Sequence, residues 1–185
     1  MKTRQLTAVL AFTVAFAATA SATPYTRVLP GSAIDFSATQ MGVTMKGHFA
    51  KFDARVAFDP ANAATDKLSL QVDAASADAG SSQTNGLIVG ADWLDAAHHP
   101  QAAFVARRFT AAGPGRWWVD GTFSVKGHSA PLRVLALAHA SGAELALDAD
   151  FTLQRLQWAL GSGAWADTSV VGASIPVHVH LLLGR

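Results

Sequence analysis

The stretch GSAIDFSATQMGVTMKGHFAKFDARVAFDP, residues 31–60, decides the fold class. Its apolar residues recur at every second position, first from Ile34 to Ala38, then from Met41 to Met45, and again from Phe52 to Phe58. Alternation with period two is typical of β-strands that have one apolar and one polar face. No interval in this stretch is long enough for a helical crossover between parallel strands. The stretch therefore predicts an antiparallel meander of three strands.

The rest of the chain extends this pattern. Further alternating runs lie at residues 68–72, 102–110, 116–126, 132–138, 145–153 and 175–183. Turn sequences separate them, such as Gly-Pro-Gly at 113–115 and the segment at 127–131. The aperiodic tract at 74–85 leads into a predicted helix over 83–89, with Ser81 or Ser82 as its N-cap. We expect an all-β protein whose roughly eight antiparallel strands close into a barrel, with one short helical excursion.

The first residues have the pattern of a secretory signal. Lys2 and Arg4 precede an uncharged run from Leu6 to Ala20, and small residues in an A-x-A pattern end at Ala22. The run is short for a membrane span, so a membrane anchor is the less favoured alternative. We expect residues 1–22 to be a cleaved signal peptide, residues 23–185 to form one domain, and the mature protein to reside in the periplasm.

Composition excludes several functional classes. The chain has 14 basic and 13 acidic residues, and removal of Lys2 and Arg4 changes the net charge from +1 to 12 − 13 = −1. No basic field remains for nucleic acid. Cysteine is absent, so burial and strand pairing must stabilise the fold without disulfides. Charged residues make up 15% of the chain, below the usual quarter or so, and some of the apolar residues can line a cavity.

The sequence contains no recognisable active site or metal site. His178 and His180 share a face of the last predicted strand and have a spacing that can chelate, with the adjacent pair His98-His99 as further candidates. No third ligand has a recognisable spacing, and this face of the strand is predicted to point outward. No G-x-S-x-G motif occurs, and carboxylates that flank a short helix commonly cap it. We therefore expect neither catalysis nor a bound metal.

The order of several short motifs resembles the YceI family, secreted bacterial proteins with a lipocalin-like barrel that hold an isoprenoid or similar lipid. The resemblance covers nearly the whole mature chain. The matching segments are Tyr25, Ile34 to Phe36, Gly42-Val43, Gly47-x-Phe49, Phe58-Asp59-Pro60, Ala91 to Asp95, the hairpin Val119-x-Gly121-x-Phe123-x-Val125-x-Gly127, and Arg155 to Gly161.

The resemblance implies binding, sequestration or transport of an isoprenoid-like amphiphilic lipid, without catalysis and without a cofactor other than a bound isoprenoid or quinone-like lipid. An alternative follows from family members that occur beside or fused to cytochrome b561-like proteins. In that alternative, the chain handles a quinone as the partner of a membrane redox system. A barrel packed solid by its own aromatic side chains also remains open, because sequence does not distinguish a filled interior from a hollow one.

Strand phase together with the resemblance predicts the ligand contacts. The predicted lipid-lining residues are Ile34, Phe36, Met41, Val43, Met45, Phe52, Leu87, Trp93, Phe104, Phe123, Phe151, Trp158 and Leu160. The predicted head-group contacts are Gln40, where many relatives carry a histidine, and Arg155, which matches an arginine of the family. Trp93 and Leu94 either close one end of the core, which is favoured, or contact the ligand. Arg107 and Arg108 either meet an anionic head group or solvate an outer face.

Overall fold

The computed structural model describes residues 23–185, so the predicted signal peptide at 1–22 lies outside the described residues. The strands are β1 (Arg27–Val28), β2 (Ala33–Gln40), β3 (Val43–Phe49), β4 (Phe52–Ala57), β5 (Lys67–Asp73), β6 (Ala77–Asp78), β7 (Gln101–Ala111), β8 (Arg116–Val125), β9 (His128–Ser141), β10 (Glu144–Gln154) and β11 (Ser174–Gly184). The helices are α1 (Ser82–Val89) and short 3-10 helices at Ala63–Thr65, Ala74–Ser76, Arg155–Trp158 and Gly163–Trp165.

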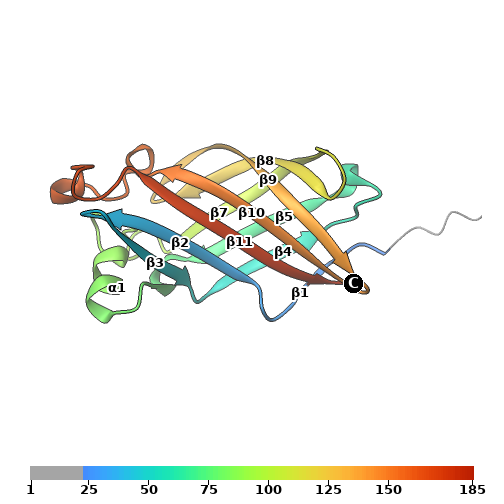
Figure 1. The fold of residues 1–185 in the computed structure, drawn as a ribbon, viewed down its shortest axis with the longest axis horizontal. Coiled ribbons are helices and arrows are strands. Elements are labelled where there is room, and N and C mark those ends of the chain that lie inside the picture. Colours follow the sequence, from blue (N-terminus) through green and yellow to red (C-terminus); the bar gives the residue numbers. More distant parts are fainter. Residues whose placement is uncertain (1–22) are drawn as a thin grey trace, which may run out of the picture.

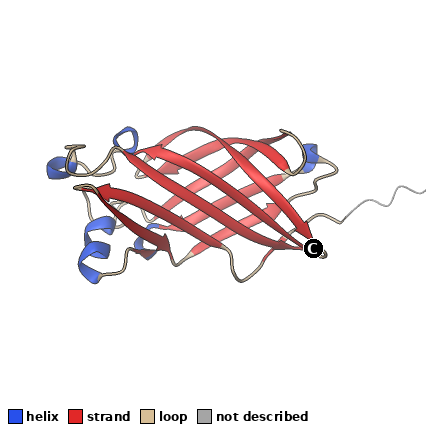
Figure 2. Ribbon diagram, in the orientation of Figure 1, coloured by secondary structure: helices blue, strands red, loops and turns tan. Residues whose placement is uncertain are grey.

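The strands form one 11-stranded antiparallel sheet in the order β4-β5-β7-β8-β9-β10-β11-β2-β3-β6, with β1 attached to β11. The sheet curls around a common interior (Figures 1 and 2). Tyr25, just before β1, exchanges two backbone hydrogen bonds of 2.9 and 3.0 Å with Phe58, just after β4. This bridge connects the two sides of the sheet at the end that holds the C-terminus. The all-β lipocalin-like fold with one short α-helix is confirmed.

A two-residue turn joins β2 to β3 and changes which residues face inward. Met41 and Gly42 have φ of 48° and 81°, the left-handed values of a type I′ hairpin turn. Gln40 therefore pairs with Val43 across the hairpin. The predicted continuous apolar row through Met41, Val43 and Met45 is wrong at its first two members, which are 77% and 66% exposed. Met41 belongs to the turn, and Val43 is the first residue beyond it.

The β8–β9 connection is tighter than the sequence suggests. Lys126 and Gly127, with φ of 48° and 74°, form the turn, and β9 begins at His128. Pro131 therefore lies inside a strand, opposite Thr122, although the predicted turn extended to it. This position is tolerated because β10 pairs with β9 only over residues 136–141, so no neighbouring strand requires the missing N–H of the proline.

The two ends of the barrel differ. At one end lie α1, the β2–β3 turn and the connection between β10 and β11, while β1 and the C-terminus lie at the other (Figure 1). Ser81 caps α1, because its hydroxyl accepts a hydrogen bond of 3.1 Å from the backbone N–H of Thr84. Among residues 23–185, no helix combines the length and apolar character needed to cross a bilayer.

Candidate functional site

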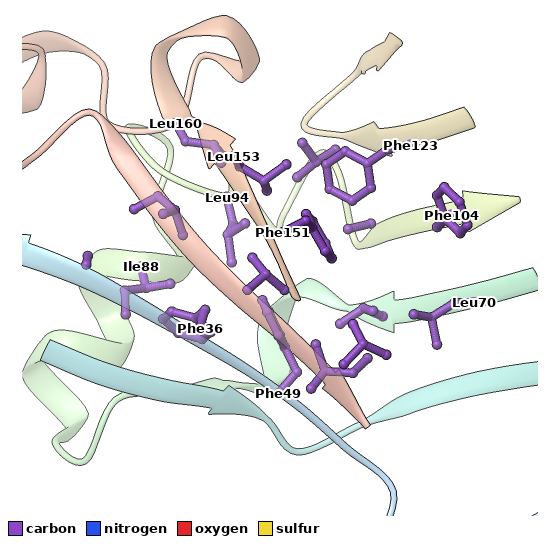
Figure 3. A pocket seen from close by; sticks show the side chains of 18 of the residues that line it. Phe36, Phe49, Leu70, Ile88, Leu94, Phe104, Phe123, Phe151, Leu153 and Leu160 are labelled. Carbon is purple, nitrogen blue, oxygen red and sulfur yellow. The ribbon is translucent and has the colours of Figure 1, made fainter. Parts of the chain in front are cut away.

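The interior of the barrel contains a partly open cavity of about 230 Å³. Inward-facing side chains of strands on all sides and of α1 point into this space (Figure 3). Its aromatic lining residues are Phe36, Phe49, Phe104, Phe123, Phe151, Trp93 and Trp165. Protein interiors are normally close-packed, with few voids larger than a water molecule. The interior is therefore hollow, and the aromatic side chains of the strands surround the space without filling it.

The cavity wall is almost entirely hydrocarbon. The lining residues that carry amide, ammonium or hydroxyl groups are Gln40, Lys46 and Thr84. All three come from β2, β3 and α1, toward the end that contains the β2–β3 turn. A buried water needs two to four polar partners, which the remainder of the wall lacks. The cavity is therefore suited to an apolar guest whose polar part sits at one end.

Arg155 organises the segment that borders this end of the cavity. Its side chain is fully buried and donates five hydrogen bonds, each 2.7–3.0 Å long. The acceptors are the backbone carbonyls of Gly172, Leu160, Gly161, Trp165 and Val171. Desolvation by burial lowers the pKa of the Arg155 guanidinium from its ordinary value.

This geometry corrects the predicted head-group role of Arg155. A guanidinium has five N–H donors, and all five are used by backbone carbonyls. None remains for a ligand, and Arg155 does not line the cavity. Leu160, Trp165 and Val171, whose carbonyls it holds, do line the cavity. Arg155 therefore positions the cavity wall.

The three segments at this end are tied to one another. The backbone N–H groups of Gly161 and Ser162 donate to the carbonyl of Asp92 at 2.8 and 2.9 Å. Met41 N–H donates to the carbonyl of Val170 at 2.9 Å, which connects the β2–β3 turn to the segment after Arg155. These bonds make the end of the cavity one connected rim, defined here as residues 40–43, α1 with residues 90–94, and residues 160–172.

Trp93 and Leu94 lie where the closed end of the core meets the cavity, and their contact with a ligand stays a prediction. Leu94 is buried in the core, and both residues line the cavity. The ring of Trp93 packs against that of Trp165, with 6.2 Å between centroids. The pair closes this end of the core and at the same time faces the cavity.

Most of the predicted lining residues border the cavity. Those that do are Ile34, Phe36, Met45, Leu87, Trp93, Phe104, Phe123, Phe151 and Leu160, together with the predicted head-group residue Gln40. Their contact with a lipid stays a prediction, because their position shows only that they face the space a ligand would occupy.

Four predicted lining residues lie elsewhere. Met41 and Val43 are exposed at the β2–β3 turn, as described above. Phe52 is the first residue of β4 and packs partly buried against the core without reaching the cavity. Trp158 belongs to the 3-10 helix at Arg155–Trp158 and packs edge-on against Phe123, with 4.9 Å between centroids. Trp158 therefore packs behind the cavity wall. Strand phase did not predict its position because the chain has left the strand conformation at this point.

Sequence reasoning missed several lining residues. Phe49 continues the inward row of β3, and the period-two pattern was sufficient to find it. Lys46 lies in the outward phase of β3 yet borders the cavity near the rim. Thr84, Trp165 and Val171 come from α1 and from the irregular segment before β11, where no strand pattern predicts which side chains face inward.

The other polar candidates lie outside the cavity lining. His178 bonds Asp150 at 2.8 Å and His180 bonds Asp148 at 2.6 Å, between neighbouring strands. In the part of the chain that the structure describes, no group of three or more His, Asp or Glu side chains is arranged to hold a metal ion. Arg107 and Arg108 are both exposed at a register shift between β7 and β8, which places them on the outer face.

The fold and the cavity define an all-β, lipocalin-like barrel with a hydrophobic interior. A model of the YceI-like domain matches residues 25–183, and the chain belongs to this family. The crystal structure of BcnA from Burkholderia cenocepacia is similar at 34% identity and a TM-score of 0.80, covering 82% of this chain and 95% of that one.

More distant relatives share the fold. The YceI protein of Campylobacter jejuni matches with a TM-score of 0.70 at 17% identity, covering 76% of this chain and 85% of its own. A polyisoprenoid binding domain from Saccharophagus degradans, implicated in plant cell wall breakdown, matches with a TM-score of 0.68 at 15% identity, covering 88% and 98%. A UPF0312 protein of Vibrio cholerae is 30% identical over 106 residues, which is 57% of this chain and 56% of that protein. The match thus spans little more than half the length of this curated relative.

Proposed function

We propose that the protein binds an isoprenoid-like amphiphilic lipid in the periplasm and sequesters or carries it without catalysis. The observation that carries this proposal is the cavity of about 230 Å³ inside the barrel, with its hydrocarbon wall. Membership of the YceI-like domain family and the fold shared with a polyisoprenoid binding domain support it. The periplasmic location depends on the predicted signal peptide, and cell fractionation of the full-length chain tests it.

The energetics favour recognition through the lipid tail. Burial of about ten methylenes would contribute roughly 8 kcal/mol, at about 0.8 kcal/mol for each group. Loss of translational freedom and ordering of the tail cost several kcal/mol of this. A polar contact at the rim adds only about 1–3 kcal/mol. The tail therefore sets most of the affinity, and the polar rim residues select among head groups.

The side chains of the cavity offer little to catalysis. The lining includes no carboxylate and no imidazole, the groups that most often act as general acid and base. The one lysine among the lining residues, Lys46, is exposed and lies in the outward phase of β3. The site therefore suits retention of a ligand better than its conversion.

A binding titration with a matched pair of variants tests the proposal. Trp93 and Trp165 line the cavity and report ligand entry through their fluorescence. Ala149 lines the cavity, so Ala149→Phe places a ring in the ligand space, whereas Ala146→Phe adds the same volume on the outward phase of β10. We expect farnesol to bind the natural protein and the Ala146→Phe variant, and Ala149→Phe to weaken binding at least tenfold. Equal affinity in all three proteins would contradict a ligand in the cavity.

Quinone handling beside a cytochrome b561-like partner stays a prediction. A quinone with a prenyl tail would fit the same hydrocarbon wall, since the tail is what the wall contacts. No feature of the rim residues distinguishes a quinone ring from another head group. The chemical identity of the natural ligand decides between the two alternatives.

A further inference from the structure

The end of the barrel that holds the C-terminus (Figure 1) is packed with aromatic side chains. Phe58, just after β4, is fully buried, and its ring packs against those of Phe109 and Trp117, with 5.8 and 5.5 Å between centroids. Tyr25, which is bonded to Phe58 through the backbone, is also buried, and the guanidinium of Arg185 lies over its ring, 4.7 Å from the centroid. These four aromatic residues form a plug, and none of them lines the cavity.

The boundary between the plug and the cavity can be followed along individual strands. On β8, the inward row passes from Trp117 in the plug to Val119 in the cavity lining. On β10 and β11, Leu145 and Leu183 pair with each other outside the lining, and both are buried. Four lining residues at this boundary, each at most 4% exposed, form the floor of the cavity: Val119, Ala136, Leu147 and Leu181. The cavity therefore ends at the plug.

The opposite end of the cavity, at the rim, is more exposed. Leu87 of α1 lines the cavity there and is 45% exposed, and Trp165 is half-buried. Gln40 and Thr84, which carry the neutral polar groups of the lining, also belong to the rim. An amphiphile with its tail in this space therefore leaves its head group at the rim, and the tip of the tail ends at the floor.

The size of the space limits how much of a tail it holds. An apolar cavity of about 150 Å³ accommodates benzene, a ring of six carbons. By proportion, a space of about 230 Å³ holds about nine carbons, or about two isoprene units. The close-packed plug occupies the barrel behind the floor, so a longer tail has no room there.

We propose that the floor and the plug select ligands by tail length, so that the barrel takes about two isoprene units and the remainder of a longer tail emerges at the rim. This proposal rests on the proposed function, because it presumes a tail inside the barrel. Trp117 and Ala136 are the specificity-determining residues. They are cross-strand partners between β8 and β9, with Ala136 in the cavity lining and Trp117 in the plug beside it.

A series of prenyl alcohols that differ only in tail length tests the proposal. Prenol, geraniol, farnesol and geranylgeraniol, with one to four isoprene units, are titrated into the natural protein, and the fluorescence of Trp93 and Trp165 reports binding. We expect affinity to rise at least about tenfold from prenol to geraniol, because the second unit is buried in the cavity. Each unit beyond geraniol should add less than about threefold, because it lies at the rim and stays partly in water.

Ala136→Leu raises the floor. The larger side chain occupies the space in which the tip of the second unit lies, so we expect affinity for geraniol to fall at least about fivefold and affinity for prenol to change less than about twofold. Ala146→Leu is the matched control, because it adds the same volume on the outward phase of β10. It should leave the length preference of the natural protein unchanged.

Trp117→Ala lowers the floor by opening space in the plug. We expect the gain in affinity from geraniol to farnesol to increase to at least about tenfold, because a third unit then enters the barrel. Trp118→Ala is the control, because it removes the same ring from the neighbouring, exposed position of β8. Trp117→Ala is a large-to-small substitution in the core and can prevent folding. In that case the Ala136→Leu titrations decide the question alone.

Two results would overturn selection by the floor while leaving lipid binding intact. One is a gain for each unit beyond geraniol as large as that from prenol to geraniol. The other is a length preference that Ala136→Leu leaves unchanged. Failure of all four alcohols to bind the natural protein would instead overturn the proposed function.

Discussion

The guanidinium of Arg155 lies over the indole ring of Trp93, 5.5 Å from the ring centroid. The arginine belongs to the 3-10 helix after β10, and the tryptophan follows α1 some sixty residues earlier in the chain. Trp93 lines the cavity, whereas Arg155 sits behind it with every donor bonded to a carbonyl. A residue that does not line the cavity thus holds together two of the three segments that form the rim.

Arg155→Met should be strongly destabilising. The substitution leaves five carbonyls, three of them buried and two part-buried, without this donor and removes the group that packs on Trp93, so we expect a loss of about 3–5 kcal/mol in the free energy of unfolding. Urea unfolding monitored by tryptophan fluorescence measures this loss. Arg133→Met is the matched control, because Arg133 also lies over an indole, that of Trp118 at 4.8 Å, but on the exposed surface. We expect the control to cost less than about 1 kcal/mol. Similar losses for both variants would contradict the structural role of Arg155.

Strand phase predicted the inward rows of the long, regular strands. The row from Val119 to Val125 in β8 is buried or lines the cavity, as its period-two pattern indicates. The errors cluster where the chain leaves the strand conformation. Met41 lies in a tight turn within an apparently unbroken alternation, and Trp158 lies in a 3-10 helix. A pattern with period two contains no information about where such a turn or helix interrupts it.

The chemistry of the rim was harder to predict than its location. Arg155 was selected because it matches an arginine of the family, but its burial and its five carbonyl acceptors depend on how residues 160–172 fold back over it. The position of Arg155 also depends on its contact with Trp93, some sixty residues earlier in the chain, which local patterns do not encode. The hollow interior likewise became visible only in three dimensions.

Gly121→Ala should perturb the cavity wall. A Cβ at this position would lie 2.5 Å from the ring of Phe104 and 2.6 Å from the carbonyl oxygen of Val105. The backbone is fixed by its strand pairing, so the ring must move toward the cavity. We expect a loss of about 1–3 kcal/mol in unfolding free energy together with weaker farnesol binding. Gly86→Ala is the control, because nothing lies within 4 Å of a Cβ there and the residue is helical. It should stabilise the protein by about 0.5–1 kcal/mol and leave binding unchanged. If the Gly121→Ala variant had the stability and farnesol affinity of the natural protein, the expected displacement of the Phe104 ring into the cavity would be contradicted.

Asp66 should make stability decrease as the pH rises. Burial raises the pKa of this carboxyl from 3.8 to about 6, with a smaller contribution from the charge of Asp59. One oxygen accepts the Asp59 backbone N–H at 2.7 Å, and the other is buried without a partner among the described residues. The folded state therefore binds the proton more tightly than the unfolded state. Its contribution to stability is complete below about pH 4 and is lost as the pH rises through about 6.

Asp66→Asn should remove this dependence, because the amide does not titrate. Between pH 4 and pH 7 we expect the free energy of unfolding of the natural protein to fall by about 2 kcal/mol relative to that of the variant. This is less than the full shift of the Asp66 pKa implies, because the carboxyl is only partly buried. Urea unfolding of both proteins at several pH values gives the difference between their unfolding free energies. The other carboxyls contribute equally to both proteins, so their effects cancel in this difference. Parallel stability curves for the two proteins would show that Asp66 is ionised in the folded state throughout this range.

Extraction of the purified full-chain protein with organic solvent, followed by mass spectrometry, tests lipid binding most directly. For the natural protein we expect one predominant isoprenoid lipid in a near-stoichiometric amount, and we expect it to be depleted in the Ala149→Phe variant and retained in Ala146→Phe. A redox-active quinone as the extracted species would favour the alternative in which the protein serves a membrane redox system. An empty extract, together with no rise in melting temperature when prenyl lipids are added, would contradict lipid binding in the barrel.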